Sequence, residues 1–128
     1  MATIFSKIIA GEIPSYKIYE DEAYYAFLDI NPLAKGHTLV IPKVEQDYIF
    51  DLSDDILSGL MLTAKRIAVQ LKSKLECKRV AVVVIGLEVP HAHIHLIPIN
   101  NESDVDFSRE RVKLTSEEFT LLASELLM

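Results

Sequence analysis

The sequence predicts an α+β domain with a five-stranded, mostly antiparallel sheet, one long helix, a short N-terminal helix and a C-terminal helix. Two patterns support this class. Short segments rich in β-branched and aromatic residues alternate with turn residues, and one long stretch repeats its apolar residues about every 3.6 positions. With 128 residues, half of them apolar, the chain is long enough for one buried core and too short for two. We therefore expect a single domain over residues 1–128.

The first third of the chain predicts a helix followed by three strands. Residues 3–10 are expected to form a short helix that is capped by their first residue, a threonine. Segments 16–20 and 23–28 are joined by two acidic residues and predict a hairpin. Segment 37–42 predicts the third strand after a turn, and its alternation places His37 on one face with the leucine and isoleucine that follow.

The long helix is expected to begin after Ser53, a residue type that caps helices, and to keep its apolar period as far as Leu75. Residues 80–85 are β-branched except for one alanine, which predicts a central strand covered on both faces. Residues 91–99 predict the strand beside it. Residues 100–113 are polar without a period, and a connection of that length is often functional or mobile. A capping box then predicts the C-terminal helix.

Composition limits the partners. Nineteen acidic and thirteen basic side chains give a net charge of −6, which argues against a nucleic-acid binder. An anionic substrate would need local donors such as backbone N–H groups and histidines.

Cys77 is the only cysteine, so it cannot form an internal disulfide, which is consistent with a reducing compartment. Because neither a signal peptide nor a membrane span of about 18 apolar residues is found, we expect a cytoplasmic protein without a membrane partner.

Three of the four histidines, His91, His93 and His95, alternate along one predicted strand. Alternation places their side chains on a single face. Burying three polar rings together costs free energy unless each ring has partners, so the pattern favours function over packing. Two chemistries remain open at this point. Three neutral imidazoles can bind zinc, although the usual companion motifs are absent. Alternatively, one imidazole attacks an electrophile such as phosphorus while the others orient it and bind negative charge.

Three segments in this order resemble the histidine triad (HIT) family, in particular its Hint-like branch of nucleoside phosphoramidate and nucleotidyl hydrolases. The segments are I-F-S-K-I-I-A-G-E-I-P-S, L-D-I-N-P-L-A-K-G-H-T-L-V-I-P-K and H-A-H-I-H-L-I-P. The resemblance covers nearly the whole chain and implies the HIT-like fold, with a core of about residues 3–100. Residues 101–128 are then a C-terminal extension to which no family role can be transferred. The resemblance implies no cofactor.

The resemblance also implies a mechanism. His93, the middle histidine, would attack the α-phosphorus of a purine nucleoside phosphoramidate or adenylate and form a nucleotidyl intermediate that water releases as the monophosphate. His91 and His95 would contact the phosphate or the leaving group, and His37 would belong to the hydrogen-bonded set that orients them. The attacking nitrogen must be unprotonated, so turnover is expected to fall below about pH 6.5.

The nucleotide-binding residues implied by the resemblance lie near the N-terminus. Asp29 matches the acidic residue that receives the ribose hydroxyls, and Phe5, Ile8, Phe27 and Ile30 match the apolar wall around the base. These residue types also fit simpler roles. An aspartate can hydrogen-bond the turn that follows it, and the four apolar side chains can be ordinary core.

The chain departs from the family pattern just before the triad, where Leu87 and Glu88 replace a polar glutamine and a small residue near the phosphate. A carboxylate there would repel a phosphate. Glu88 could point away, act as an acid for the leaving group or alter the choice of substrate. A second hypothesis is therefore a nucleotide-binding regulatory module with weak or no catalysis, and a third is a metalloenzyme with histidine ligands.

Two further expectations concern metal and oligomeric state. Some relatives hold a structural zinc with two cysteines and a histidine, but those positions are Thr3, Ser6 and Glu45 here, so no such zinc is expected. Relatives pair as homodimers through the long helix and a central strand, which correspond to residues 53–76 and 80–85. We therefore expect a homodimer.

Overall fold

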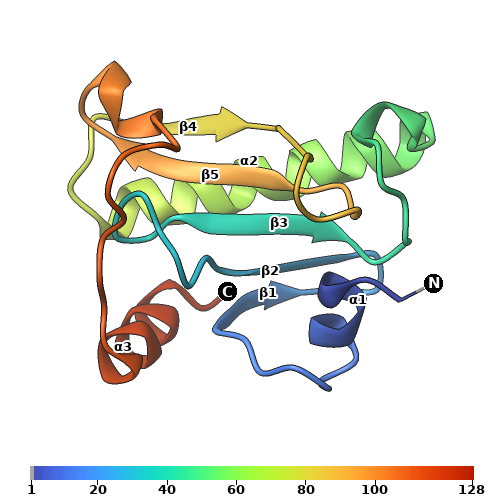
Figure 1. Cartoon of the computed structure of the whole chain (residues 1–128), viewed down its shortest axis with the longest axis horizontal. Coiled ribbons are helices and arrows are strands. Elements are labelled where there is room, and N and C mark those ends of the chain that lie inside the picture. The colour runs from blue at the N-terminus through green and yellow to red at the C-terminus, as the bar shows by residue number, and fades with distance from the viewer. Residues whose placement is uncertain (1) are drawn as a thin grey trace.

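The fold is one five-stranded antiparallel sheet with helices on both faces, and the computed structural model describes residues 2–128 (Figure 1). The strand order is β1-β2-β3-β5-β4, and every neighbouring pair is antiparallel. The predicted fold class is confirmed. The elements are α1 (Ile4–Ile9), β1 (Lys17–Glu20), β2 (Tyr24–Leu28), β3 (Thr38–Pro42), η1 (Ile49–Asp51), α2 (Asp54–Lys74), β4 (Arg79–Val83), β5 (Ile94–Ile99), η2 (Glu102–Val105) and α3 (Ser116–Leu126).

The helices begin where side chains satisfy their first free N–H groups. The Thr3 hydroxyl accepts from the backbone N–H of Ser6 over 3.0 Å at the start of α1, and Ser53 accepts from the backbone N–H of Ile56 over 3.2 Å at the start of α2. Thr115 forms the predicted capping box of α3. Across residues 2–128, no helix combines the length and apolarity that a bilayer crossing requires.

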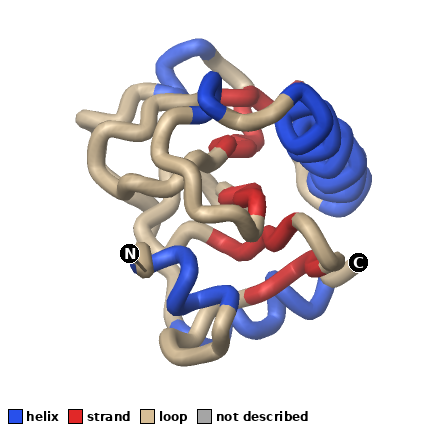
Figure 2. The backbone as a smooth tube through the Cα atoms, turned by 90° about the vertical axis from the view of Figure 1, so that its right-hand side faces the viewer, coloured by secondary structure: helices blue, strands red, loops and turns tan. Residues whose placement is uncertain are grey.

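The strands separate two apolar layers, because alternate side chains point to opposite faces of the sheet. Tyr24, Ala26 and Leu28 of β2 face the larger core, which α2 and α3 cover. Tyr25 and Phe27 of the same strand face a smaller cluster under α1. Figure 2 shows α2 on one side of the strands and the N-terminal helix on the other. The predicted site lies on the α1 face.

The prediction that residues 80–85 form a central strand is wrong. β4 is an edge strand that ends at Val83, and the side chain of Val82 is 48 % exposed. Its neighbour β5 is an interior strand, in which His95 pairs with Leu39 on one side and Val83 on the other. A run of β-branched residues favours extended backbone with apolar neighbours, but it does not indicate whether those neighbours belong to the same chain.

β5 is also shorter than predicted. It begins at Ile94, so His91 and His93 precede the strand and only His95 lies inside it. All three side chains are buried nevertheless.

Candidate functional site

A pocket of about 420 Å³ opens on the α1 face of the sheet, where α1, the turn after β2, the chain before β5 and the segment after β5 meet. His93 and His95 line it together with two carboxylates, Asp29 and Glu88. The other lining residues are Phe5, Asn31, Leu39, Ile85, Gly86, Leu87, Val89, Phe107 and Arg111.

His93 is held in one tautomer. Its Nδ1 lies 2.7 Å from the backbone carbonyl oxygen of His91. A carbonyl oxygen can only accept, so Nδ1 carries the ring proton and Nε2 keeps its lone pair. Burial lowers the pKa of His93, although the hydrogen bond to His91 and the charge of Glu88 act in the other direction. The ring is therefore neutral at pH 7, with an unprotonated nitrogen available to the pocket.

The ring of His91 lies behind the pocket, fully buried, and is not among the lining residues. Its Nε2 donates to the backbone oxygen of Pro42 over 2.8 Å, so its Nδ1 is an acceptor and receives the hydroxyl of Thr3 over 2.8 Å. Both ring nitrogens are thus bonded to protein atoms. His91 acts on the site through its carbonyl group, which orients His93.

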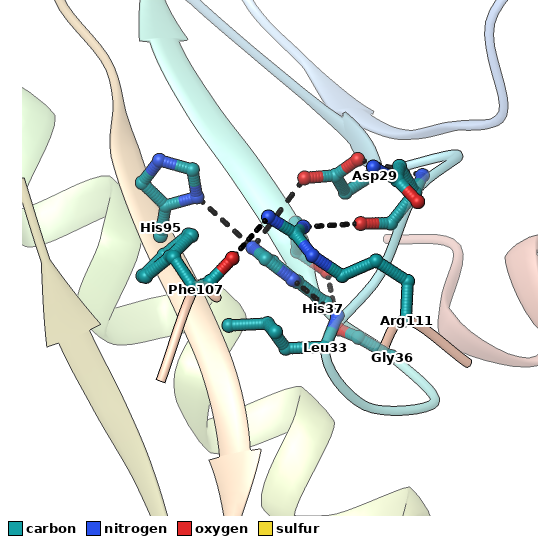
Figure 3. Close-up of polar contacts among 9 residues, drawn as sticks. Asp29, Leu33, Gly36, His37, His95, Phe107 and Arg111 are labelled. Carbon is teal, nitrogen blue, oxygen red and sulfur yellow. Dashed lines mark hydrogen bonds and ion pairs between the residues drawn. The ribbon is translucent and has the colours of Figure 1, made fainter. Parts of the chain in front are cut away.

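His37 and His95 form a directed chain of hydrogen bonds (Figure 3). The backbone N–H of Leu33 donates to Nδ1 of His37 over 3.0 Å, so the proton of His37 lies on Nε2, which donates to Nδ1 of His95 over 2.9 Å. This leaves the Nε2–H of His95 as the ring donor available to a ligand. Burial lowers the pKa of His37 to about 3 and that of His95 to about 4, so both rings are neutral at pH 7.

The two roles considered for Asp29, bonding the turn that follows it and receiving ribose hydroxyls, are compatible with each other. Its Oδ1 accepts from the backbone N–H of Asn31 over 2.8 Å, as a turn residue does, while its Oδ2 lies 3.6 Å from Nε2 of His37. Burial raises the pKa of Asp29, and Glu88 raises it further, against lowering effects of the Asn31 N–H group and Arg111. One carboxylate oxygen therefore anchors the turn and the other faces the histidine chain.

Comparison with known proteins identifies the family of this chain. The HIT domain family model matches residues 10–102. The chain belongs to the HIT family. It is 37 % identical over 133 aligned positions, covering 98 % of this chain and 96 % of the relative, to an uncharacterized HIT-like protein of Borreliella burgdorferi. It is 44 % identical over 104 positions to the adenosine 5'-monophosphoramidase HNT1 of Saccharomyces cerevisiae, with 79 % of this chain and 65 % of the yeast protein covered.

Solved HIT structures share the fold. A HIT-like protein of Bartonella henselae, described as involved in cell-cycle regulation, superposes with a TM-score of 0.84 and 30 % identity, covering 97 % of this chain and 92 % of the other.

The HIT domain brings only part of the predicted apolar wall to the pocket. Phe5 lines it and contacts the ring of His93 edge-on at 5.1 Å between centroids. Ile8 and Phe27 belong to the same buried cluster as Phe5 but do not line the pocket. Ile30 is 74 % exposed and is not a lining residue.

Leu87 and Glu88, which precede the three alternating histidines, are both exposed lining residues. Leu87 is 88 % exposed. The charge of Glu88 is close enough to raise the pKa values of both His93 and Asp29. Glu88 is therefore part of the electrostatic environment of the site.

Sequence reasoning missed the contribution of the segment after η2. Phe107 packs its ring 5.0 Å from that of His95 and 6.2 Å from that of His37. Arg111 donates to the backbone oxygen of Asn31 over 2.7 Å. The only sequence signal was the length of the polar stretch that follows the triad, because neither residue belongs to a periodic pattern. The hydroxyl of Thr3 was likewise expected only as a helix cap.

Metal binding is a poorer fit to these donors than hydrogen bonding. In the described part of the chain, the potential ligand atoms that lie within 4.8 Å of one another belong to Asp29, His37 and His95, rather than to the three alternating histidines. Because Leu33 donates to Nδ1 of His37, the Nε2 that faces the other two residues is protonated. A metal ion there would have to displace that proton or break the bond to Leu33.

Proposed function

We propose that this HIT domain hydrolyses purine nucleoside 5'-phosphoramidates, or related adenylates, to the monophosphate through a nucleotidyl intermediate on Nε2 of His93. The observation that carries the proposal is the hydrogen bond from Nδ1 of His93 to the carbonyl oxygen of His91, which leaves a neutral imidazole with its lone pair at the pocket. The similarity to a yeast adenosine 5'-monophosphoramidase supports the substrate class.

The reaction would proceed in two displacements at phosphorus. In the first, Nε2 of His93 forms a bond to the α-phosphorus while the bond from phosphorus to the leaving nitrogen breaks, and the amine takes up a proton from solvent. In the second, a water oxygen bonds to phosphorus, the bond to Nε2 breaks, and the water proton returns to solvent. The Nε2–H of His95 would donate to a phosphate oxygen in both steps, where negative charge develops.

The test compares the full-length wild type with His93→Ala on a fluorogenic adenosine phosphoramidate. We expect turnover to fall by at least about 1,000-fold in the variant, since removing a nucleophile removes the covalent path. Rapid quenching and mass spectrometry should show an added adenylyl group on the wild type alone. Equal turnover by the two proteins would contradict the assignment of the nucleophile.

A second candidate function is nucleotide binding with weak catalysis, and the position of Glu88 favours it, because a carboxylate at the pocket repels a phosphate. The same preparation separates the two functions. Micromolar binding of AMP without measurable turnover of phosphoramidates or adenylates would support a binding module, whereas turnover supports the enzyme.

We further propose that the domain acts as a homodimer, in which a second copy covers the apolar surface beside β4. A cavity of about 480 Å³ lies there, lined mainly by apolar side chains of η1, α2, β4 and the loop that follows β4. Phe50 and Val82 in this lining are 71 % and 48 % exposed. The outer edge of β4 pairs with no other strand of the described chain and is continuous with this surface.

Oligomeric mass by light scattering tests the dimer. Val82→Lys should shift the protein to monomer, because it places a charge in the apolar interface. Leu121→Lys is the control, since Leu121 is 66 % exposed on α3, away from β4. A wild type that is monomeric at 100 µM would overturn the dimer.

A further inference from the structure

Arg111 is the only lysine or arginine among the described residues that line the histidine pocket. It lies outside the segment that matches the HIT family, which ends at residue 102. Two carboxylates, Asp29 and Glu88, line the same pocket. Without Arg111, the fixed charges around a bound phosphate would therefore be negative, in a chain whose net charge is already −6.

The guanidinium group of Arg111 is held in place by protein atoms. Its Nη1 donates to the backbone oxygen of Asn31 over 2.7 Å and its Nη2 to that of Phe107 over 3.2 Å. The ring of Phe107 lies 5.4 Å from Cζ of Arg111. The backbone N–H of Val112 donates to the oxygen of Pro32 over 2.9 Å and fixes the segment to the same turn. A side chain that is ordered beforehand loses little entropy when a ligand arrives.

Arg111 keeps hydrogen-bonding capacity for a ligand. A guanidinium carries five N–H groups, and within residues 2–128 the bonds to Asn31 and Phe107 use two of them. Three donors remain on a planar, permanently charged group, and such groups bind phosphate oxygens in pairs.

Arg111 lies beside the histidine pair (Figure 3). Phe107, to which it is bonded, packs on the ring of His95. The positive charge of Arg111 also lowers the pKa values of both His95 and His37, which places it within electrostatic reach of those rings. His95 and Arg111 therefore provide donors to the same part of the pocket.

We propose that Arg111 is a phosphate-binding residue, and that through it the segment after β5 makes the pocket select phosphorylated nucleosides over neutral ones. The inference rests on the proposed function for the identity of the ligand as a nucleotide. The proposal adds a phosphate-binding residue that is not one of the three triad histidines. It places the positive charge of the site beyond residue 102, where the segment matched by the HIT family model ends.

The experiment measures dissociation constants of AMP and of adenosine, which lacks the phosphate, by calorimetry and by competition up to millimolar ligand. The full-length proteins are the wild type, Arg111→Gln, Arg111→Lys and Arg109→Gln. Arg109→Gln is the matched control, because Arg109 is exposed, lies on the same segment and pairs with Asp104 over 3.0 Å. It removes the same charge from the molecule without touching the pocket.

We expect Arg111→Gln to weaken AMP binding about tenfold or more, as loss of a hydrogen bond to a charged group does, and adenosine binding less than about twofold. Arg111→Lys should recover part of the AMP affinity because it keeps the charge, and Arg109→Gln should change neither ligand. Equal weakening of both ligands by Arg111→Gln would show that Arg111 only holds the segment in place, and would overturn the inference. Unchanged AMP binding would overturn it as well.

These outcomes are separable from failure of the proposed function. Selective loss of AMP affinity in Arg111→Gln, combined with undiminished turnover in His93→Ala, would support the phosphate-binding role and contradict the nucleophile. A wild type that binds AMP no better than adenosine would overturn the role of Arg111, whatever the fate of His93.

Discussion

The backbone carbonyl oxygen of His91 accepts the Nδ1 proton of His93 over 2.7 Å, and this one bond determines which nitrogen of His93 can act as a nucleophile. The ring of His91 is fixed in turn by Thr3 and Pro42. The first and second histidines of the triad therefore differ in environment: the ring of His91 is buried and bonded at both nitrogens, whereas His93 presents a lone pair to the pocket.

The rate of turnover should depend on pH through His93. Burial lowers its pKa below the ordinary value of 6.5, so the decrease in kcat/KM that accompanies protonation of the ring should be centred below pH 6.5. Burial of His93 thus places the fall of kcat/KM in acid at a lower pH than an unperturbed histidine would give. A profile of kcat/KM from pH 4 to 8, restricted to the range in which the protein stays folded, checks this. A limb centred at or above pH 6.5 would contradict it.

Thr3 should matter for stability more than a surface threonine does. Its hydroxyl caps α1 and donates to Nδ1 of His91, which is fully buried. Thr3→Val keeps the shape and removes both bonds, so we expect the free energy of unfolding to fall by about 2 to 4 kcal/mol, the sum of a lost cap and a buried unpaired nitrogen. Thr3→Ser keeps the hydroxyl and should lose about 1 kcal/mol or less. Urea denaturation measures both, and equal losses would refute the argument.

Stability should also decrease in acid because of the buried histidine pair. The pKa values of His37 and His95 are about 3 and about 4 in the folded state, against 6.5 when unfolded. Below pH 6.5 the unfolded chain binds more protons than the folded chain, so the free energy of unfolding falls as pH decreases from 6.5 towards 4. Each histidine contributes up to about 1.4 kcal/mol per pH unit.

Replacing one member of the pair tests that contribution. His37→Gln removes one titrating ring while retaining polar atoms, so denaturation between pH 6.5 and 4 should show a slope that is lower than that of the wild type by about one proton. An unchanged slope would mean that His37 does not titrate between the two states.

The sequence predicted local features well, because they depend on neighbours along the chain. The caps Thr3, Ser53 and Thr115 are all present. Features that depend on the tertiary placement of residues could not be predicted from the sequence. The composition of residues 80–85 suits a central strand and an apolar edge strand equally. Arg111 reaches the pocket only because its segment is bonded to the turn at Asn31, about 80 residues earlier in the chain, and no periodicity encodes that contact.

One substitution can distinguish whether Glu88 repels a bound phosphate or acts as an acid for the leaving group. Glu88 lines the pocket with His93 and raises the pKa of that ring, so its carboxylate is close to where a phosphate would bind. If it only repels the phosphate, Glu88→Gln should tighten AMP binding about threefold to tenfold, which corresponds to about 0.7 to 1.4 kcal/mol of removed repulsion at an intermediate dielectric. The pH at which kcat/KM begins to fall in acid should also move lower, because Glu88 raises the pKa of His93.

If Glu88 instead protonates the leaving group, kcat should fall while AMP affinity changes little. Glu12→Gln, at an exposed position outside the pocket, controls for the change in net charge and should alter neither quantity. We expect tighter binding without loss of kcat, because Glu88 is an exposed residue at the rim of the pocket and a negative charge there opposes a phosphate.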